Sequence, residues 1–188
     1  MRGVLIVIAV LFSCTAYAGE VSVTSTDGGS NVTVLSGSIK VNSGSTLRKT
    51  FYILNEDGSP ITLQDLGVET RYDDRSYEFY PKGKISANED VQAFWVSFIL
   101  FDVYGDRVES LAYSEVEDLA QGANHAFSKY AAWRASENDV EAYLTSVAYV
   151  RKARRKNGTV WTADMNAIVE KLKELPLVIT DDTTKDEK

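Results

Sequence analysis

Apolar and polar side chains alternate with a period of two along most of the chain after Gly19. Turn-forming residues (Gly, Asn, Asp and Pro) interrupt this alternation about every eight to twelve residues, which is typical of an all-β sandwich or barrel. The segments between these turns are rich in β-branched and aromatic residues, which favour strands. The pattern predicts strands at 21–26, 31–41, 50–55, 61–63, 68–73, 76–81, 83–87, 95–103, 107–116 and 124–133.

The stretch WVSFILFDVYGD, Trp95–Asp106, is apolar on both of its predicted faces. Phe98 and its alternate neighbours point to one side, and Ile99 and its alternate neighbours point to the other. A strand of this kind is central and covered on both faces. Asp102 ends the apolar run, and we assign it a structural role at the start of a turn, where Asp is common, rather than a role as a ligand or an acid.

A single helix is predicted at 162–175. Thr162 is a suitable N-cap, Asp164 lies in the first turn where the helix dipole favours a negative charge, and Pro176 is a natural stop. The apolar residues are spaced so that they share one face, and we expect this face to cover the second side of the central strand. That face consists of Met165, Ile168, Leu172 and Leu175.

The segment before this helix is ambiguous. Ser136 and Asp139 could cap a helical turn, whereas 145–151 alternates as a strand does. We predict one long strand, followed by a hairpin turn at Asn157-Gly158 and a returning strand at 159–161, because Asn-Gly is a strong signal for a tight hairpin.

The first 18 residues have the form of a secretory signal peptide. Arg2 precedes an apolar run, and Ala16-Tyr17-Ala18 is a suitable cleavage site. The same segment allows a lipoprotein signal, since Leu11–Cys14 resembles a lipobox in which Phe12 is an unusual residue. Either form of processing places the protein outside the cytoplasm, with a single domain over 19–179 and a polar tail at 180–188 that we expect to be disordered.

Composition excludes several classes of function. The chain has 27 Asp and Glu against 20 Lys and Arg, so nucleic acid is an unfavourable principal partner. With one histidine, His125, and no cysteine left after cleavage, the chain cannot assemble the usual zinc or copper ligand sets. A phosphate-binding loop and a nucleophile elbow are also missing, so we expect neither a cofactor nor catalysis.

One basic segment, RKARRK at 151–156, contrasts with the acidic background. Its charges could simply keep the predicted hairpin soluble and prevent edge-to-edge pairing of strands. Alternatively they form a recognition patch for an anionic glycan or an acidic envelope protein, with aromatic side chains as anchors. The candidate patch is Arg151, Lys152, Arg154, Arg155, Lys156, Trp161 and Tyr149.

The residues Phe98-Ile99-Leu100-Phe101-Asp102, followed by Tyr104-Gly105-Asp106, resemble the F-x-L-Y-D signature of the FxLYD family, with Phe101 in place of the tyrosine. The downstream segment LAQGANHAF, with Ala120 where proline is usual, is similar to that family as well. The resemblance covers about residues 82–133. It implies an immunoglobulin-like antiparallel β-sandwich in an exported or lipid-anchored bacterial protein, without catalytic residues.

These observations together favour a periplasmic or secreted, non-catalytic binding or interaction module of a bacterial envelope, built as a β-sandwich with one C-terminal helix. Two alternatives remain. The first is an outer-membrane lipoprotein with a structural role, anchored at Cys14, which is the one form in which we expect contact with a membrane. The second is a hydrolase or a hydrolase inhibitor, which a deep pocket with convergent polar groups would favour.

Overall fold

The computed structural model describes residues 22–24, 32–40, 46–73, 76–128, 133–180 and 183–184, with side chains from residue 49 onward except that of Asp73. The predicted signal peptide at 1–18 and the possible lipidation site Cys14 lie outside these ranges.

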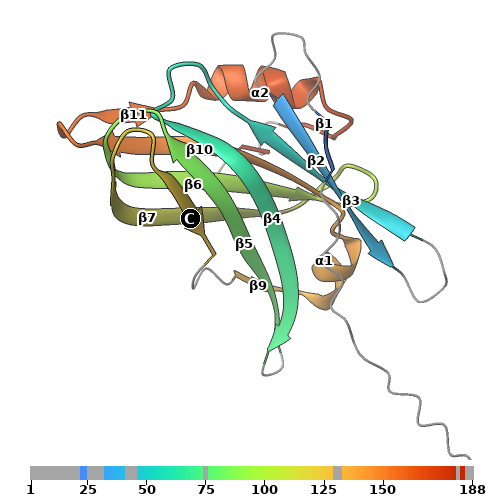
Figure 1. The fold of residues 1–188 in the computed structure, drawn as a ribbon. Helices are drawn as coiled ribbons and strands as arrows, with labels where there is room; N and C mark the ends of the chain where they lie inside the picture. Colours follow the sequence, from blue (N-terminus) through green and yellow to red (C-terminus); the bar gives the residue numbers. More distant parts are fainter. Residues whose placement is uncertain are drawn as a thin grey trace, which may run out of the picture.

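The described residues form two β-sheets and two short helices (Figure 1). The larger sheet has seven strands in the order β1-β2-β3-β10-β6-β7, with β11 beside the end of β10. The smaller sheet has the order β4-β5-β8, with β9 also beside β5. The mainly β, two-sheet architecture expected from the sequence is confirmed. The bounds are β1 Ser22–Thr24, β2 Val32–Lys40, β3 Thr46–Leu54, β4 Ile61–Asp73, β5 Ser76–Ala87, β6 Val91–Phe101, β7 Arg107–Leu119, β8 Asn124–Phe127, β9 Trp133–Ala135, α1 Glu137–Ala142, β10 Thr145–Arg155, β11 Val160–Thr162 and α2 Met165–Lys173.

One strand pair departs from the expected antiparallel arrangement. β3 and β10 run parallel, with Thr50 opposite Thr145 and Leu54 opposite Tyr149, whereas every other pair among the described strands is antiparallel. Parallel neighbours need a long connection, and here 90 residues, 55–144, separate β3 from β10. As a result β10 lies inside the larger sheet, between β3 and β6.

The main core lies between the two sheets. Phe98 and Leu100 of β6 are fully buried in it, together with Phe79 and Ile85 of β5. Several shorter predicted strands merge in the smaller sheet, where β4 and β5 form one long hairpin. Pro81 is accommodated inside β5 because it lies between the stretches that pair with β9 and with β8, where no ladder hydrogen bond from its nitrogen is needed.

A second core lies on the outer face of the larger sheet, under α2. Ile168 and Leu172 of α2 are buried against Ile99 and Phe101 of β6. The predictions that both faces of this strand are covered and that the helix covers the second one are confirmed.

The predicted start of this helix at Thr162 is wrong. Thr162 pairs with Lys152 in the β10–β11 ladder, which holds its backbone extended. Asp164 is the N-cap instead, and its Oδ1 accepts a hydrogen bond from Asn166 N at 3.0 Å. α2 ends at Lys173, two residues before the predicted end.

The long strand predicted to begin near Ser136 is also wrong in its first part. Ser136 caps α1, and its hydroxyl and the Asp139 carboxylate each accept a hydrogen bond from the other residue's backbone N–H. This capping box satisfies free donors locally, so the helical turn forms, and β10 starts only at Thr145.

Two turns form as predicted. Asp102 Oδ1 accepts hydrogen bonds from Tyr104 N at 2.8 Å and from Asp106 N at 2.9 Å, which confirms its structural role. At the β10–β11 hairpin, Gly158 has a φ of +86°, a conformation that favours glycine, and its N–H donates to Arg155 O at 2.9 Å.

The C-terminal segment differs from the disordered tail expected at 180–188, as far as the structure describes it. Thr183 is buried, and its hydroxyl accepts a hydrogen bond from Thr180 N at 2.7 Å. The Arg151 guanidinium lies 3.5 Å from Thr184 O. These contacts place Thr183 and Thr184 on the outer face of the larger sheet, where burial against the sheet outweighs their polar character.

Candidate binding site

The basic segment singled out in the sequence forms the second half of β10, and a bulge decides which way its side chains point. Val150 pairs with Val96 and Lys152 pairs with Trp95, so Arg151 is an extra residue in the strand. The bulge shifts the alternation by one position. Ala153 is therefore buried in the main core, while Arg151 and Lys152 both lie on the outer face.

Both of these cations approach the indole ring of Trp95. Lys152 Nζ lies 5.3 Å from the ring centre, and Arg151 Cζ lies 5.7 Å from it. Attraction between a cation and the negative face of an aromatic ring holds side chains in this geometry. The bulge thus places positive charge over a tryptophan at the open end of the sheet.

The candidate patch divides into three groups in the structure. Lys152, Arg154 and Lys156 are exposed. Arg155 instead forms a two-point ion pair with Glu89, at 2.6 Å from Nε and 3.2 Å from Nη2. Because Arg155 donates these bonds, the pKa of Glu89 is lowered.

The remaining members of the candidate patch are less accessible. Tyr149 belongs to the core under α2 and is almost fully buried, so it is not part of the patch. Trp161 is half-buried and packs against both cores. Arg151 is half-buried between Trp95 and Thr184. The cations left for an external ligand are therefore Lys152, Arg154 and Lys156.

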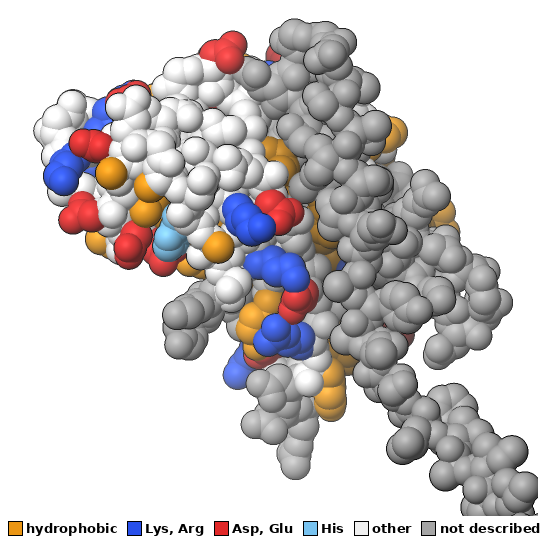
Figure 2. All heavy atoms as spheres, viewed as in Figure 1, with side chains coloured by type: hydrophobic (Ala, Val, Ile, Leu, Met, Phe, Trp, Pro, Cys, Tyr) orange, Lys and Arg blue, Asp and Glu red, His pale blue; other side chains and the backbone are white. Residues whose placement is uncertain are grey.

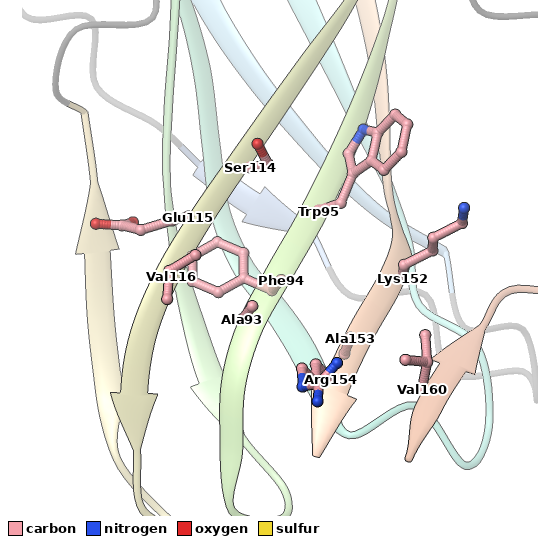
Figure 3. Close-up of a pocket in the computed structure, with 10 residues that line it drawn as sticks. All are labelled: Ala93, Phe94, Trp95, Ser114, Glu115, Val116, Lys152, Ala153, Arg154 and Val160. Atoms are coloured by element: carbon pink, nitrogen blue, oxygen red, sulfur yellow. The ribbon is translucent and has the colours of Figure 1, made fainter. Parts of the chain in front are cut away.

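An open depression of about 220 Å³ lies on the outer face beside these cations, across β7, β6, β10 and β11 (Figure 3). Its surface is mostly apolar, with Lys152 and Arg154 on one side and Glu115 on the other. It is lined by Ala93, Phe94, Trp95, Ser114, Glu115, Val116, Lys152, Ala153, Arg154 and Val160.

Two valines on opposite edges of this depression are unusually exposed. Val116 of β7 is 86% exposed, and Val160 of β11 is 55% exposed. The indole N–H of Trp95 is buried and has no hydrogen-bond partner among the described residues. Exposed apolar side chains that are grouped together commonly mark an interaction surface.

The basic segment in the sequence predicts the cations of this depression, but no pattern in the sequence predicts Trp95 as its floor. The alternation along this strand predicts Trp95 only as part of the face covered by the C-terminal helix. The helix covers the far part of that face, at Ile99 and Phe101, and leaves Trp95 beyond its reach. One signal was present in the sequence: Val116 interrupts a run of acidic residues, in the series Glu115, Val116, Glu117.

The outer face of the smaller sheet is different, because its charges are paired with one another. Figure 2 shows basic and acidic side chains alternating along β4 and β5. Glu69 forms ion pairs with Lys82 and with Arg71, the latter at 2.8 Å, and these hydrogen bonds lower the pKa of Glu69, that from Lys82 most. Lys84 lies 3.9 Å from Asp65. An anionic ligand would have to compete with these carboxylates, so this face is the weaker candidate.

The described residues offer neither a metal centre nor a membrane-spanning helix. No group of three or more His, Cys, Asp or Glu side chains that could hold a metal ion occurs among the described residues. Neither described helix is long and apolar enough to cross a bilayer. His125 is hydrogen-bonded to Glu115 across the edge of the sandwich, at 3.0 Å.

Comparison with known proteins adds little. No known protein family matches the chain, and no characterised protein matches it. Among solved structures, a hypothetical protein from Peptoclostridium difficile 630 is similar, with 9% sequence identity and a TM-score of 0.44. The match covers 63% of this chain and 92% of the other. A similarity of this size supports no inference about function.

Proposed function

We propose that this protein is a non-catalytic binding module, and that the depression around Trp95 holds an acidic peptide segment of a partner protein. The observation that carries the proposal is the combination of an apolar floor with cations on one side only. Trp95 and the exposed Val116 and Val160 supply the apolar surface, and Lys152 and Arg154 supply the charge.

Each part of the depression has a role in this binding. An apolar side chain of the ligand packs on Trp95 between the two valines, where it removes exposed apolar surface from water. Carboxylates of the ligand lie beside Lys152 and Arg154, whose side chains have no ion-pair partner described in the structure and are exposed to solvent.

A peptide fits this surface better than an anionic glycan does. A polyanionic glycan is bound chiefly through rows of cations, whereas most of the lining here is apolar. The depression is also open and lacks the convergent polar groups typical of a hydrolase site, which favours binding over catalysis.

The proposed setting is the bacterial cell envelope. It rests on the predicted signal peptide at 1–18 and on the resemblance to the FxLYD family over about 82–133. Mass spectrometry of the mature protein distinguishes the soluble from the lipid-anchored form. A chain that starts at Gly19 is soluble, and a chain that starts with a modified Cys14 is lipid-anchored.

Binding is tested by titrating the protein with a short synthetic peptide of alternating Glu and Val, followed by the NMR signal of the Trp95 indole N–H. We expect that signal to shift. We also expect the double variant K152A/R154A to bind the peptide at least about tenfold more weakly, which corresponds to a loss of about 1.4 kcal/mol of binding free energy. The matched control is K84A on the smaller sheet, which should bind as the wild type does. A peptide of alternating Lys and Val should not bind.

Two outcomes would overturn the proposal. One is a Trp95 signal that does not respond to the Glu-Val peptide. The other is equal affinity in K152A/R154A and in the wild type. If heparin shifts the same signal and the peptide does not, the ligand is an anionic glycan instead.

A further inference from the structure

The outer face around Trp95 has opposite charges on its two sides. Its β10 side carries the exposed cations Lys152 and Arg154. Its other side is the edge strand β7, where Glu117 and Asp118 are exposed directly after Val116. The apolar floor at Ala93 and Trp95 lies between the two sides.

The β7 side has the chemistry of the ligand proposed above. Val116, at 86% exposed, is an apolar side chain that points into solvent, and acidic residues follow it in the chain. Among the described strands, β7 pairs with β6 along one edge and is the last strand of the larger sheet on that side. A register shift between the Ala93–Val116 and Val91–Leu119 pairs places Glu117 and Asp118 in a bulge, which disfavours continuous strand addition at this edge. A partner is therefore expected to approach over the face rather than along the edge.

A two-fold axis parallel to the strands makes this face complementary to itself. Such an axis stacks two copies face to face and exchanges their β7 and β10 sides. Glu117 and Asp118 of each copy then lie opposite Lys152 and Arg154 of the other. The apolar parts of the two copies, around Trp95, meet at the centre of the interface.

We propose that the partner of this face is a second copy of the same chain, and that the protein forms a two-fold symmetric dimer through it. This inference rests on the proposed function, since it assigns the acidic, valine-bearing ligand to β7 of the second copy. Two rims of opposite charge meet on either side of an apolar centre, an arrangement typical of specific interfaces. Because the charged pairs lie at the rim, salt weakens the dimer.

Charge reversal tests the dimer by sedimentation velocity of the full-length protein at low salt. We expect the wild type to sediment as a dimer at high concentration. The variants K152E/R154E and E117K/D118K should each dissociate at least about tenfold more readily, because like charges then face one another. An equimolar mixture of the two variants should form a heterodimer, because the acidic sides of K152E/R154E then face the basic sides of E117K/D118K. The control K84E should dimerise as the wild type does.

A wild type that remains monomeric over the whole concentration range overturns the dimer, and so does a dimer that both charge-reversed variants preserve. Failure of the mixture to associate, with both variants shown to be folded by circular dichroism, overturns the pairing of the two sides. The binding module itself is judged separately, by the Glu-Val peptide at protein concentrations where the chain is monomeric. If the protein stays monomeric but still binds this peptide, the proposal that the partner is a second copy is wrong, and the proposed binding site stands.

Discussion

His125 and Glu115 join the two sheets at one edge of the sandwich, with 3.0 Å between Nε2 and Oε2. Glu115 belongs to β7 of the larger sheet, and His125 belongs to β8 of the smaller one. The same carboxylate oxygen accepts a hydrogen bond from the Tyr113 hydroxyl at 2.8 Å. Burial and, to a smaller extent, this bond raise the pKa of Tyr113, so its hydroxyl remains a donor. Glu115 thus holds β7 in place directly beside Val116.

We predict that H125A lowers the free energy of unfolding by about 1 kcal/mol, the usual size of one hydrogen bond between partly buried side chains. Urea unfolding at neutral pH measures this change. A double-mutant cycle with E115A should give a coupling energy of about 0.5 kcal/mol or more, because the two residues are in contact. Additive effects of the two substitutions would show that the pair does not join the sheets.

A methyl group at Gly83 should destabilise the protein. A Cβ at this position would lie 2.6 Å from Phe127 Cζ and 2.7 Å from Asp65 O. Since Phe127 is packed among other aromatic rings and Asp65 O is backbone, neither can move away freely. We expect G83A to cost about 2 kcal/mol, within the range for overpacked cores. The neighbouring exposed substitution K84A should change thermal unfolding little, and equal melting temperatures of G83A and the wild type would contradict the prediction.

The contact between α2 and the larger sheet should tolerate no charge. Ile168 is 1% exposed and packs against the β6 and β10 side chains below the helix. I168D buries an unpaired carboxylate there, and we expect a loss of more than about 3 kcal/mol. N166D introduces the same group at an exposed position of the same helix, so it is the matched control. If I168D and N166D had the same melting temperature, α2 would be peripheral to the fold.

Lys49 should make the stability of the protein depend on pH in the alkaline range. Its Nζ lies 3.9 Å from the centre of the Tyr143 ring, and burial lowers its pKa from 10.5 to about 8. Below pH 8 the amine is charged in both the folded and the unfolded chain, so the folded state bears the cost of desolvation. Between pH 8 and 10.5 the Lys49 amine is mainly protonated in the unfolded chain and mainly neutral in the folded one. Because the unfolded state binds more protons there, the free energy of unfolding rises with pH through this window.

The expected rise in the free energy of unfolding through this window is at most about 3 kcal/mol. K49M should be more stable than the wild type at neutral pH and should lack this part of the pH dependence. Urea unfolding at several pH values between about 7 and 10 measures both effects. K84M changes an exposed lysine and should keep the slope of the wild type. A wild type whose stability is constant in this range, relative to K49M, would refute the role of Lys49.

Local features of this protein were accessible from the sequence because each depends on residues close together in the chain. The alternation around Phe98 and Ile99 predicts a strand buried on both faces, and the spacing of Ile168 and Leu172 predicts the helix face that covers it. Asp102 and Gly158 predict their turns through bonds to backbone groups only a few residues away. The capping box at Ser136 is of the same local kind, and the alternation that follows it in β10 obscured the signal.

The candidate site depended on tertiary structure, for a physical reason. The hydrogen-bond register between β10 and β6 creates the bulge at Arg151, and only that bulge turns Lys152 outward over Trp95. No local pattern reveals a register that is determined by a strand some fifty residues away. The pairing of Arg155 with Glu89, which removes one cation from the patch, likewise joins residues distant in sequence. The sequence by itself therefore determined the strands, their buried faces and the basic segment, whereas the long-range strand pairing decided which of those charges reach a ligand.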